Sequence, residues 1–476
     1  MREKSISVKT YQVLLLIPLY YIIGNKNIFL YALTLCLYNI FVSCFTHVSI
    51  KDTLAKINNK NERKKFFKIF GLVNVVIQLL ILILSIIVGD ITSAVLKIDD
   101  VFFPFLFMGL SVFTELLLNY LLDYLDAINY KKISLTFFKM YYYIEGVLLI
   151  IISLLLFRCF KINDNLDIGL MYLSKIISIA IIFVLSYFLI LNKKSSKMMP
   201  TSKSNLNIHK EIKKILTNNN YISIINIVEK SYYYLSIIIL YFVLSTRYNY
   251  ATDKVSKIII FVYFYGLYII KYLVDIVLYL VNKICSKRDC FERLYYTFKM
   301  FLPLSIILGI ISPLVCKVLF NSPDMAIYLV MLNFLGLNLA LCQVIINSNN
   351  NKKILYISLL LSLFFKILLS IPLINAFYRM GYNLVYGDIV SSIIGFIIII
   401  VINYVYLNYK NKKPVNYLMK IMDIIYDNII LCIILIILEF IVPIDTNNYF
   451  KSVGLMILYL IVSIMFIKIK NEKRGK

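Results

Sequence analysis

The feature that most constrains this chain is the alternation of positive charge between its long apolar segments. Fourteen such segments can be drawn, and most of the 50 Lys and Arg residues lie in the termini and in every second gap. Positive charge retained on the cytoplasmic side is the main determinant of membrane topology. The pattern therefore predicts an integral membrane protein with an even number of spans and both termini in the cytoplasm.

The apolar segments are long enough to cross a bilayer. Hydrophobic residues make up 61% of the 476 residues, and a helix of about 20 apolar residues crosses the hydrocarbon core. Because an unpaired backbone group in lipid costs several kcal/mol, these segments must be helical. The predicted all-α spans are 9–24, 28–50, 69–90, 101–125, 133–157, 166–191, 219–245, 256–281, 299–320, 324–348, 353–376, 383–408, 423–443 and 451–468.

The net charge of +25 fits this topology better than nucleic-acid binding. A charge of this size would suggest nucleic acid in a soluble protein. Here it follows from the positive-inside bias and from attraction to anionic lipid headgroups. We therefore expect anionic lipids, and no nucleic acid, among the partners.

Two pairs of short matches indicate an internal repeat. Residues 67–70 (FKIF) match 298–301 (FKMF), and 129–133 (NYKKI) match 350–354 (NNKKI). Six spans separate equivalent points, so the halves have the same orientation, as in transporters built from parallel repeats. The predicted organisation is an N-terminal six-helix lobe (1–191), a cytoplasmic basic linker (192–218), a C-terminal six-helix lobe (219–408), two additional spans (409–468) and a basic cytoplasmic tail (469–476).

Ionisable side chains within the spans are the candidate binding residues, because such groups are costly in mid-membrane and usually face the interior or a wet cavity. Lys271 and Asp275 are an i,i+4 pair that can partly neutralise itself. Lys366 and Asp388 are further ionisable residues in the eleventh and twelfth spans. The candidate cavity residues are Glu115, Lys139, Glu145, Lys175, Glu229, Lys230, Lys271 and Asp275.

Each candidate also has a structural interpretation. Lys139 could extend to the cytoplasmic interface, and Lys271 and Asp275 could form a private ion pair. As a set spread over both halves, the residues favour a polar central cavity. Its lysines would suit an anionic cargo such as a diphosphate, whereas its carboxylates could instead couple transport to a cation or a proton.

Enzyme signatures are missing from the sequence. There is no GxSxG, no HExxH and no P-loop. The eight Cys form no CxxC pair and the two His are far apart in sequence, so a zinc site is not expected. We expect a non-enzyme with no catalytic residues, metal or cofactor.

Three stretches resemble the polysaccharide and lipid-linked oligosaccharide flippases of the MOP superfamily, especially the branch named for stage V sporulation protein B. The lipid II flippases are similar more distantly. The stretches are VSIKDTLAKINNKNERKKFFKIF (48–70), LDAINYKKISLTFFKMYYYIEG (125–146) and LYLVNKICSKRDCFERLYYTFKMFLPLSIILG (278–309).

The resemblance implies a V-shaped, two-lobed MATE-like helical bundle with alternating access in the bacterial cytoplasmic membrane. Members turn lipid-pyrophosphate-linked sugars, including cell-envelope and polysaccharide precursors, from the inner to the outer leaflet. Lys230 and Lys271 match cavity cations expected on the seventh and eighth spans, and Glu145 matches the Glu of the fifth. The first two spans carry no embedded Arg, which departs from the family.

Two other functions stay open. One is a MATE-like cation-coupled exporter of small amphiphiles, whose cavity should rely on carboxylates and not on lysines. The other is a non-transporting scaffold that positions enzymes of glycan biosynthesis. A membrane glycosyltransferase is disfavoured because it should need a sizeable outer loop, and the gaps on that side are short.

Overall fold

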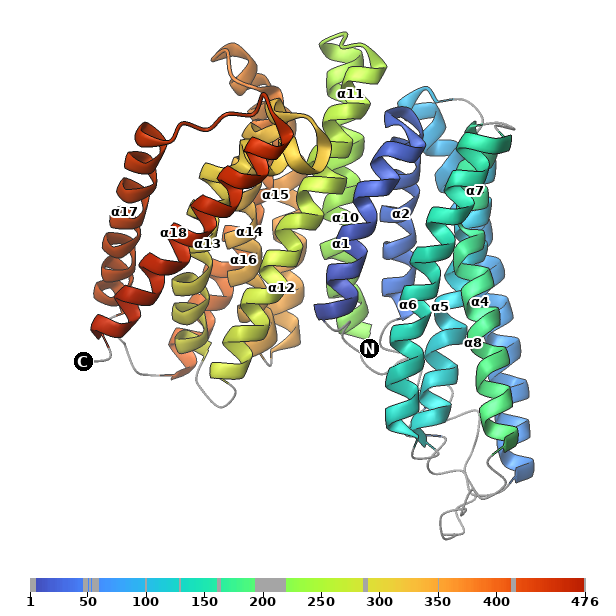
Figure 1. Ribbon diagram of the computed structural model, residues 1–476. Coiled ribbons are helices and arrows are strands. Elements are labelled where there is room, and N and C mark those ends of the chain that lie inside the picture. Colours follow the sequence, from blue (N-terminus) through green and yellow to red (C-terminus); the bar gives the residue numbers. More distant parts are fainter. Residues whose placement is uncertain are drawn as a thin grey trace. The chain divides into compact units, whose positions relative to one another are not determined.

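Every element in the described part of the chain is a helix in the computed structural model (Figure 1). The predicted linker over 192–218 lies outside the described residues except for its first residue. The described residues are 6–45, 50, 53, 60–98, 101–127, 130–160, 164–192, 220–285, 290–349, 351–411 and 417–474.

Contacts within the chain divide it into two compact units, Met1–Lys257 and Ile258–Lys476. The helices of the first unit are α1 (Ile6–Ile23), α2 (Asn25–Phe45), α4 (Lys60–Leu96), α5 (Phe102–Ala127), α6 (Lys131–Leu154), the π-helical η1 (Leu155–Phe160), α7 (Asp164–Met171), α8 (Leu173–Asn192), α10 (Asn220–Phe242), the π-helical η2 (Val243–Arg247) and, at its boundary, α11 (Thr252–Ile259).

The second unit follows directly from α11. Its helices are the π-helical η3 (Ile260–Gly266), α12 (Leu267–Ile284), α13 (Cys290–Phe320), η4 (Pro323–Met325), α14 (Ala326–Ser348), α15 (Lys352–Arg379), α16 (Leu384–Asn411), α17 (Tyr417–Ile441) and α18 (Tyr449–Arg474).

The prediction of a multi-span helical membrane protein is confirmed. Each of the fourteen predicted spans coincides with a helical segment, and twelve segments of the described chain are long and apolar enough to cross a membrane. The other two predicted spans coincide with α10 and with α18, whose apolar part is the shorter stretch Tyr449–Met465. Several helices run beyond the predicted spans, and α4 begins nine residues earlier, at Lys60.

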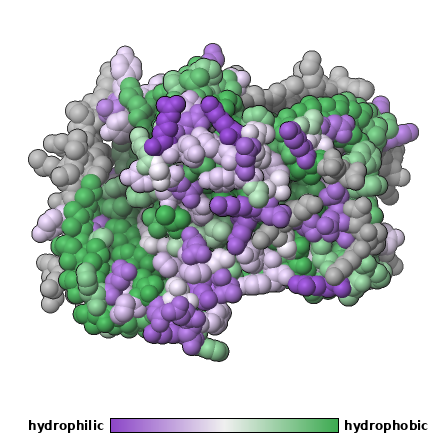
Figure 2. All heavy atoms as spheres, turned by 90° about the horizontal axis from the view of Figure 1, so that it is seen from above, coloured by the Kyte–Doolittle hydropathy of each residue, from purple (hydrophilic) through white to green (hydrophobic). Residues whose placement is uncertain are grey.

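Apolar side chains lie on the outside of the helices as well as inside. On α4, large apolar residues recur at helical spacing with exposed fractions near one half, among them Leu72, Val76, Leu79 and Ile83. A stripe of this length would aggregate in water but is stable against lipid tails. Seen from above, the molecule shows hydrophilic side chains over much of this end and hydrophobic ones along parts of its margin (Figure 2).

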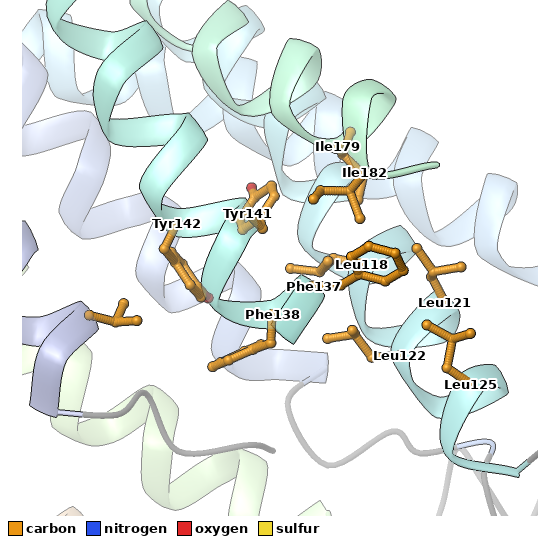
Figure 3. Close-up of a cluster of buried hydrophobic side chains, with 11 residues drawn as sticks. Leu118, Leu121, Leu122, Leu125, Phe137, Phe138, Tyr141, Tyr142, Ile179 and Ile182 are labelled. Atoms are coloured by element: carbon orange, nitrogen blue, oxygen red, sulfur yellow. The ribbon is translucent and has the colours of Figure 1, made fainter. Parts of the chain in front are cut away.

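The core of the first unit is built where α5, α6 and α8 meet. Leucines at positions 118, 121, 122 and 125 of α5 follow the three-and-four spacing of one helix face. They pack against Phe137, Phe138 and Tyr141 of α6 and Ile179 and Ile182 of α8 (Figure 3). This packing fixes α6 and α8 next to each other.

Helix α10 belongs to the first compact unit. The hydroxyl groups of Tyr234 on α10 and Thr92 on α4 are hydrogen-bonded at 2.8 Å. The rings of Tyr241 and Phe29 of α2 stack with centroids 5.0 Å apart. These two contacts are made at long range in the sequence, so span order alone did not indicate them.

In the second unit, α15 and α16 approach each other closely because the residues between them are small. Ser358, Ser362 and Ser370 lie on one face of α15 and are fully buried, with Lys366 the one large side chain at the same four-residue spacing. On α16, a Cβ atom added to Gly387 would lie 2.4 Å from the backbone nitrogen of Ile374. Small residues at such positions let membrane helices pack backbone to backbone.

We expect Gly387→Ala to destabilise the protein by about 1–3 kcal/mol, because the added methyl group would overpack the interface. Gly309→Ala is the matched control, since a Cβ there meets no heavy atom within 4 Å and Ala favours helix over Gly. Thermal melting of both variants in detergent checks this. Equal melting temperatures for the two variants would contradict the close packing.

Candidate functional site

Three of the predicted candidate residues meet in the first unit. Glu115 of α5, Glu145 of α6 and Lys175 of α8 are 5%, 8% and 6% exposed. The Lys175 ammonium forms an ion pair with Glu145 Oε1. The Tyr142 hydroxyl donates to both carboxylate oxygens of Glu115 at 3.4 and 3.5 Å.

Aromatic side chains surround these charges. The Lys175 Nζ atom lies 4.6 Å from the centroid of the Tyr38 ring of α2, within cation–π range. Glu115 and Glu145 both lie close enough to Tyr38 and Tyr141 to interact with them electrostatically. The three charged groups and the tyrosines therefore form one cluster, which we call the first-unit cluster: Tyr38, Glu115, Tyr141, Tyr142, Glu145 and Lys175.

The first-unit cluster has one carboxyl group more than it has ammonium groups. Glu145 Oε2 and the Tyr38 hydroxyl are buried and make no hydrogen bond within the described chain. Buried polar atoms of this kind normally have partners, and a buried net charge is costly. The arrangement is chemically suited to taking up one more positive charge, such as a proton or a small cation.

A second ion pair lies in the second unit, between Lys366 of α15 and Asp388 of α16. Both residues are completely buried, and Lys366 Nζ lies 2.6 Å from Asp388 Oδ1. Ser370 and Ser391 complete the surroundings of the two charges from the same helices. We call this group, together with Tyr263 of η3, the second-unit network.

The remaining candidates are on helix faces that are partly open. Lys139 on α6, Lys230 on α10, and Lys271 and Asp275 on α12 are all half-buried. Glu229 lies on α10, but its side chain is outside the described part of the structure. Lys230 is in the first unit, and Lys271 and Asp275 are in the second.

Sequence reasoning noticed Lys366 and Asp388 separately but missed that they form a pair. Two signals in the sequence could have found it. Lys366 lies in a four-residue serine repeat on one face of α15, which marks an intimate helix contact. In addition, Lys366 follows Glu145 by the same 221 residues that separate the two NxKKI matches, so the repeat already related these two positions.

Comparison with solved structures finds this fold in transport proteins of the MOP superfamily. A structure described as lipid II flippase MurJ in an inward closed conformation aligns over 99% of this chain and 99% of that chain, with a TM-score of 0.67 and 14% identity. An inward-facing multidrug resistance MATE family transporter of the MOP superfamily aligns over 89% of this chain and 96% of that chain, with a TM-score of 0.56 and 10% identity.

At these identities the likeness establishes the fold. It is the architecture that the resemblance of the three sequence stretches implied, and it extends over nearly the whole chain. No family model and no curated protein matches the sequence.

We expect Lys175→Met to destabilise the protein by about 3–5 kcal/mol, because it would leave the Glu145 carboxylate buried without its counter-charge. The double variant Lys175→Met/Glu145→Gln should recover most of this loss. Thermal or denaturant unfolding of the purified variants in detergent measures both effects.

The matched control is Lys451→Met at the solvent-accessible pair between Lys451 of α18 and Asp445 of the preceding loop. Lys451 Nζ lies 2.7 Å from Asp445 Oδ2, and hydrogen bonds from Lys451 and from the Asn447 backbone hold the pKa of Asp445 below its usual value. An exposed pair contributes little to stability. If Lys175→Met were no more harmful than this control, the cluster would not hold a buried ion pair.

Proposed function

We propose that this protein is a flippase that moves a lipid-(pyro)phosphate-linked oligosaccharide from the inner to the outer leaflet of the bacterial cytoplasmic membrane. The observation that carries the proposal is the fold likeness to a lipid II flippase over 99% of both chains. The likeness to the multidrug transporter is lower in TM-score and in coverage of this chain. The mechanism is alternating access by rocking of two helical lobes.

The residues that we assign to the phosphate groups of the cargo are Lys230 and Lys271. Each is half-buried within a predicted membrane span, so an ammonium group is held near the membrane interior without being sealed off. Ammonium groups bind phosphate oxygens as compact point charges. Lys175 and Lys366 are 6% and 0% exposed, so they are less accessible to a cargo.

Coupling of transport to a cation is assigned to the first-unit cluster. Its second carboxyl group, Glu115, is held by hydrogen bonds of 3.4 and 3.5 Å from one tyrosine. Uptake of a proton or a sodium ion would neutralise the cluster. Lys139, Glu229 and Asp275 are assigned to the polar lining of the transport path, and enzymes of glycan biosynthesis are the expected partners.

The same excess carboxyl group favours a second candidate function, a cation-coupled exporter of small amphiphiles. The two functions differ in the charge of the cargo. The ammonium groups of Lys230 and Lys271 would attract an anionic cargo but repel a cationic one. A third candidate function is a scaffold without transport activity. It would need neither the lysines assigned to the cargo nor the first-unit cluster.

A reconstituted flip assay tests the proposal. Purified protein in liposomes should accelerate the movement of a fluorescent polyprenyl-pyrophosphate sugar, measured by quenching the label in the outer leaflet. Lys271→Glu should reduce the rate at least about tenfold, the effect of losing roughly 1.4 kcal/mol of binding, while the protein still inserts.

The control is the same charge reversal at the exposed Lys451. If Lys271→Glu and Lys451→Glu changed the flip rate equally, Lys271 would not be part of the cargo site. Transport of cationic amphiphiles without any movement of the lipid-linked sugar would favour the exporter.

Glu115→Gln tests the coupling role. The variant should still equilibrate the lipid between leaflets, but an imposed proton or sodium gradient should no longer change its rate, because the titratable carboxyl group is gone. Asp324→Asn, at an exposed carboxylate in the short helix η4 at the start of a span, should behave like the unaltered protein. A full gradient response in Glu115→Gln would exclude Glu115 as the coupling group.

A further inference from the structure

The Lys366 ammonium in the second-unit network has the surroundings of a bound cation. Its Nζ atom donates to Asp388 Oδ1 at 2.6 Å, to the Asp388 carbonyl oxygen at 2.9 Å and to Ser391 Oγ at 2.9 Å. An ammonium group has three N–H donors, so its hydrogen-bonding capacity is filled by these three oxygen atoms. The whole arrangement is closed to solvent, since Lys366, Asp388 and Ser391 are all 0% exposed.

The carboxylate that faces the ammonium is itself held in place. Asp388 Oδ1 also accepts a hydrogen bond from Ser370 Oγ at 3.1 Å, and Asp388 Oδ2 accepts one from the Tyr263 hydroxyl. Tyr263 belongs to η3, the π-helical segment at the start of the second unit. The oxygen atoms around Lys366 Nζ are therefore positioned by three separate elements and do not depend on the lysine alone.

A carboxylate, a backbone carbonyl and a hydroxyl group are oxygen ligands of the kind that hard cations take in proteins. In membrane transporters, backbone carbonyls also contribute to sodium sites. We propose that Asp388 and Ser391 form a monovalent-cation site that the chain fills with its own Lys366. The tethered ammonium replaces an external ion, so the second unit is independent of sodium and potassium.

The repeat in the sequence supports this reading. Positions 221 residues before Lys366 and Asp388 hold Glu145 and Asp167, and α6 and α15 begin at Lys131 and Lys352, the same distance apart. Two carboxyl groups in the first unit thus correspond to one lysine and one carboxyl group in the second. In the second unit Lys366 supplies the positive charge at this position, whereas in the first unit the position holds Glu145 and the positive charge comes from Lys175 on another helix. The inference concerns a different site from the proposed transport function and does not rest on it.

Removing the tethered ammonium should expose the site to external ions. The test measures the melting temperature of the full-length Lys366→Ala variant in detergent, with sodium chloride, potassium chloride or choline chloride at equal ionic strength. We expect Lys366→Ala to melt several degrees higher in sodium or potassium than in choline, because a ligand that binds only the folded state stabilises it. The unaltered protein should lack any such shift attributable to Asp388.

Two further variants make the result decisive. In Lys366→Ala/Asp388→Asn the negative charge is also gone, so the alkali-cation effect should fall back to that of the unaltered protein, and Lys366→Ala/Ser391→Ala should weaken it. A folded Lys366→Ala that responds to the three salts no more than the unaltered protein does would overturn the proposal. The proposal would also be overturned if Lys366→Ala aggregated in every salt while Lys366→Ala/Asp388→Asn stayed monodisperse. That result would mean that no external cation can neutralise the Asp388 carboxylate.

Discussion

The cost of placing charge inside a membrane-spanning bundle is the constraint on which the rest of this structure depends. The chain meets it by joining neighbouring helices through ion pairs: α6 to α8 through Glu145 and Lys175, and α15 to α16 through Lys366 and Asp388. Each pair must form when the helices pack, because either partner alone would be a buried, uncompensated charge. The pairs therefore specify which helix faces meet, a task that apolar side chains perform poorly where lipid is equally apolar.

The two pairs are chemically unequal, although Glu145 and Lys366 occupy equivalent positions in the repeat. In the second unit, serine hydroxyls, a backbone carbonyl and a tyrosine satisfy every charge, and the helices approach closely beside Gly387. In the first unit, one lysine faces two carboxyl groups, and Glu145 Oε2 makes no hydrogen bond within the described chain. A satisfied network rigidifies its surroundings, whereas a partly satisfied one can change its charge. This difference is why we assign coupling to the first unit and a static role to the second.

The division of lysines follows the same logic. Lys175 and Lys366 join helices within the units through ion pairs with buried carboxylates, whereas our proposal assigns the half-buried Lys230 and Lys271 to the cargo. The attachment of α10 to the first unit through Tyr234 and Tyr241 puts these two lysines in separate units.

The sequence by itself determined the all-helical, multi-span class of the protein and the approximate positions of its helices, because apolar length and the alternation of Lys and Arg are local properties that act directly on insertion into the bilayer. It also supplied the charged residues of both pairs. It did not determine their partners, since Glu145 and Lys175, or Tyr234 and Thr92, are far apart along the chain and meet only through helix rotation and packing. Only the tertiary structure decided that Lys175 is already neutralised and that Lys366 sits among three oxygen atoms, because these facts depend on which helix faces are in contact.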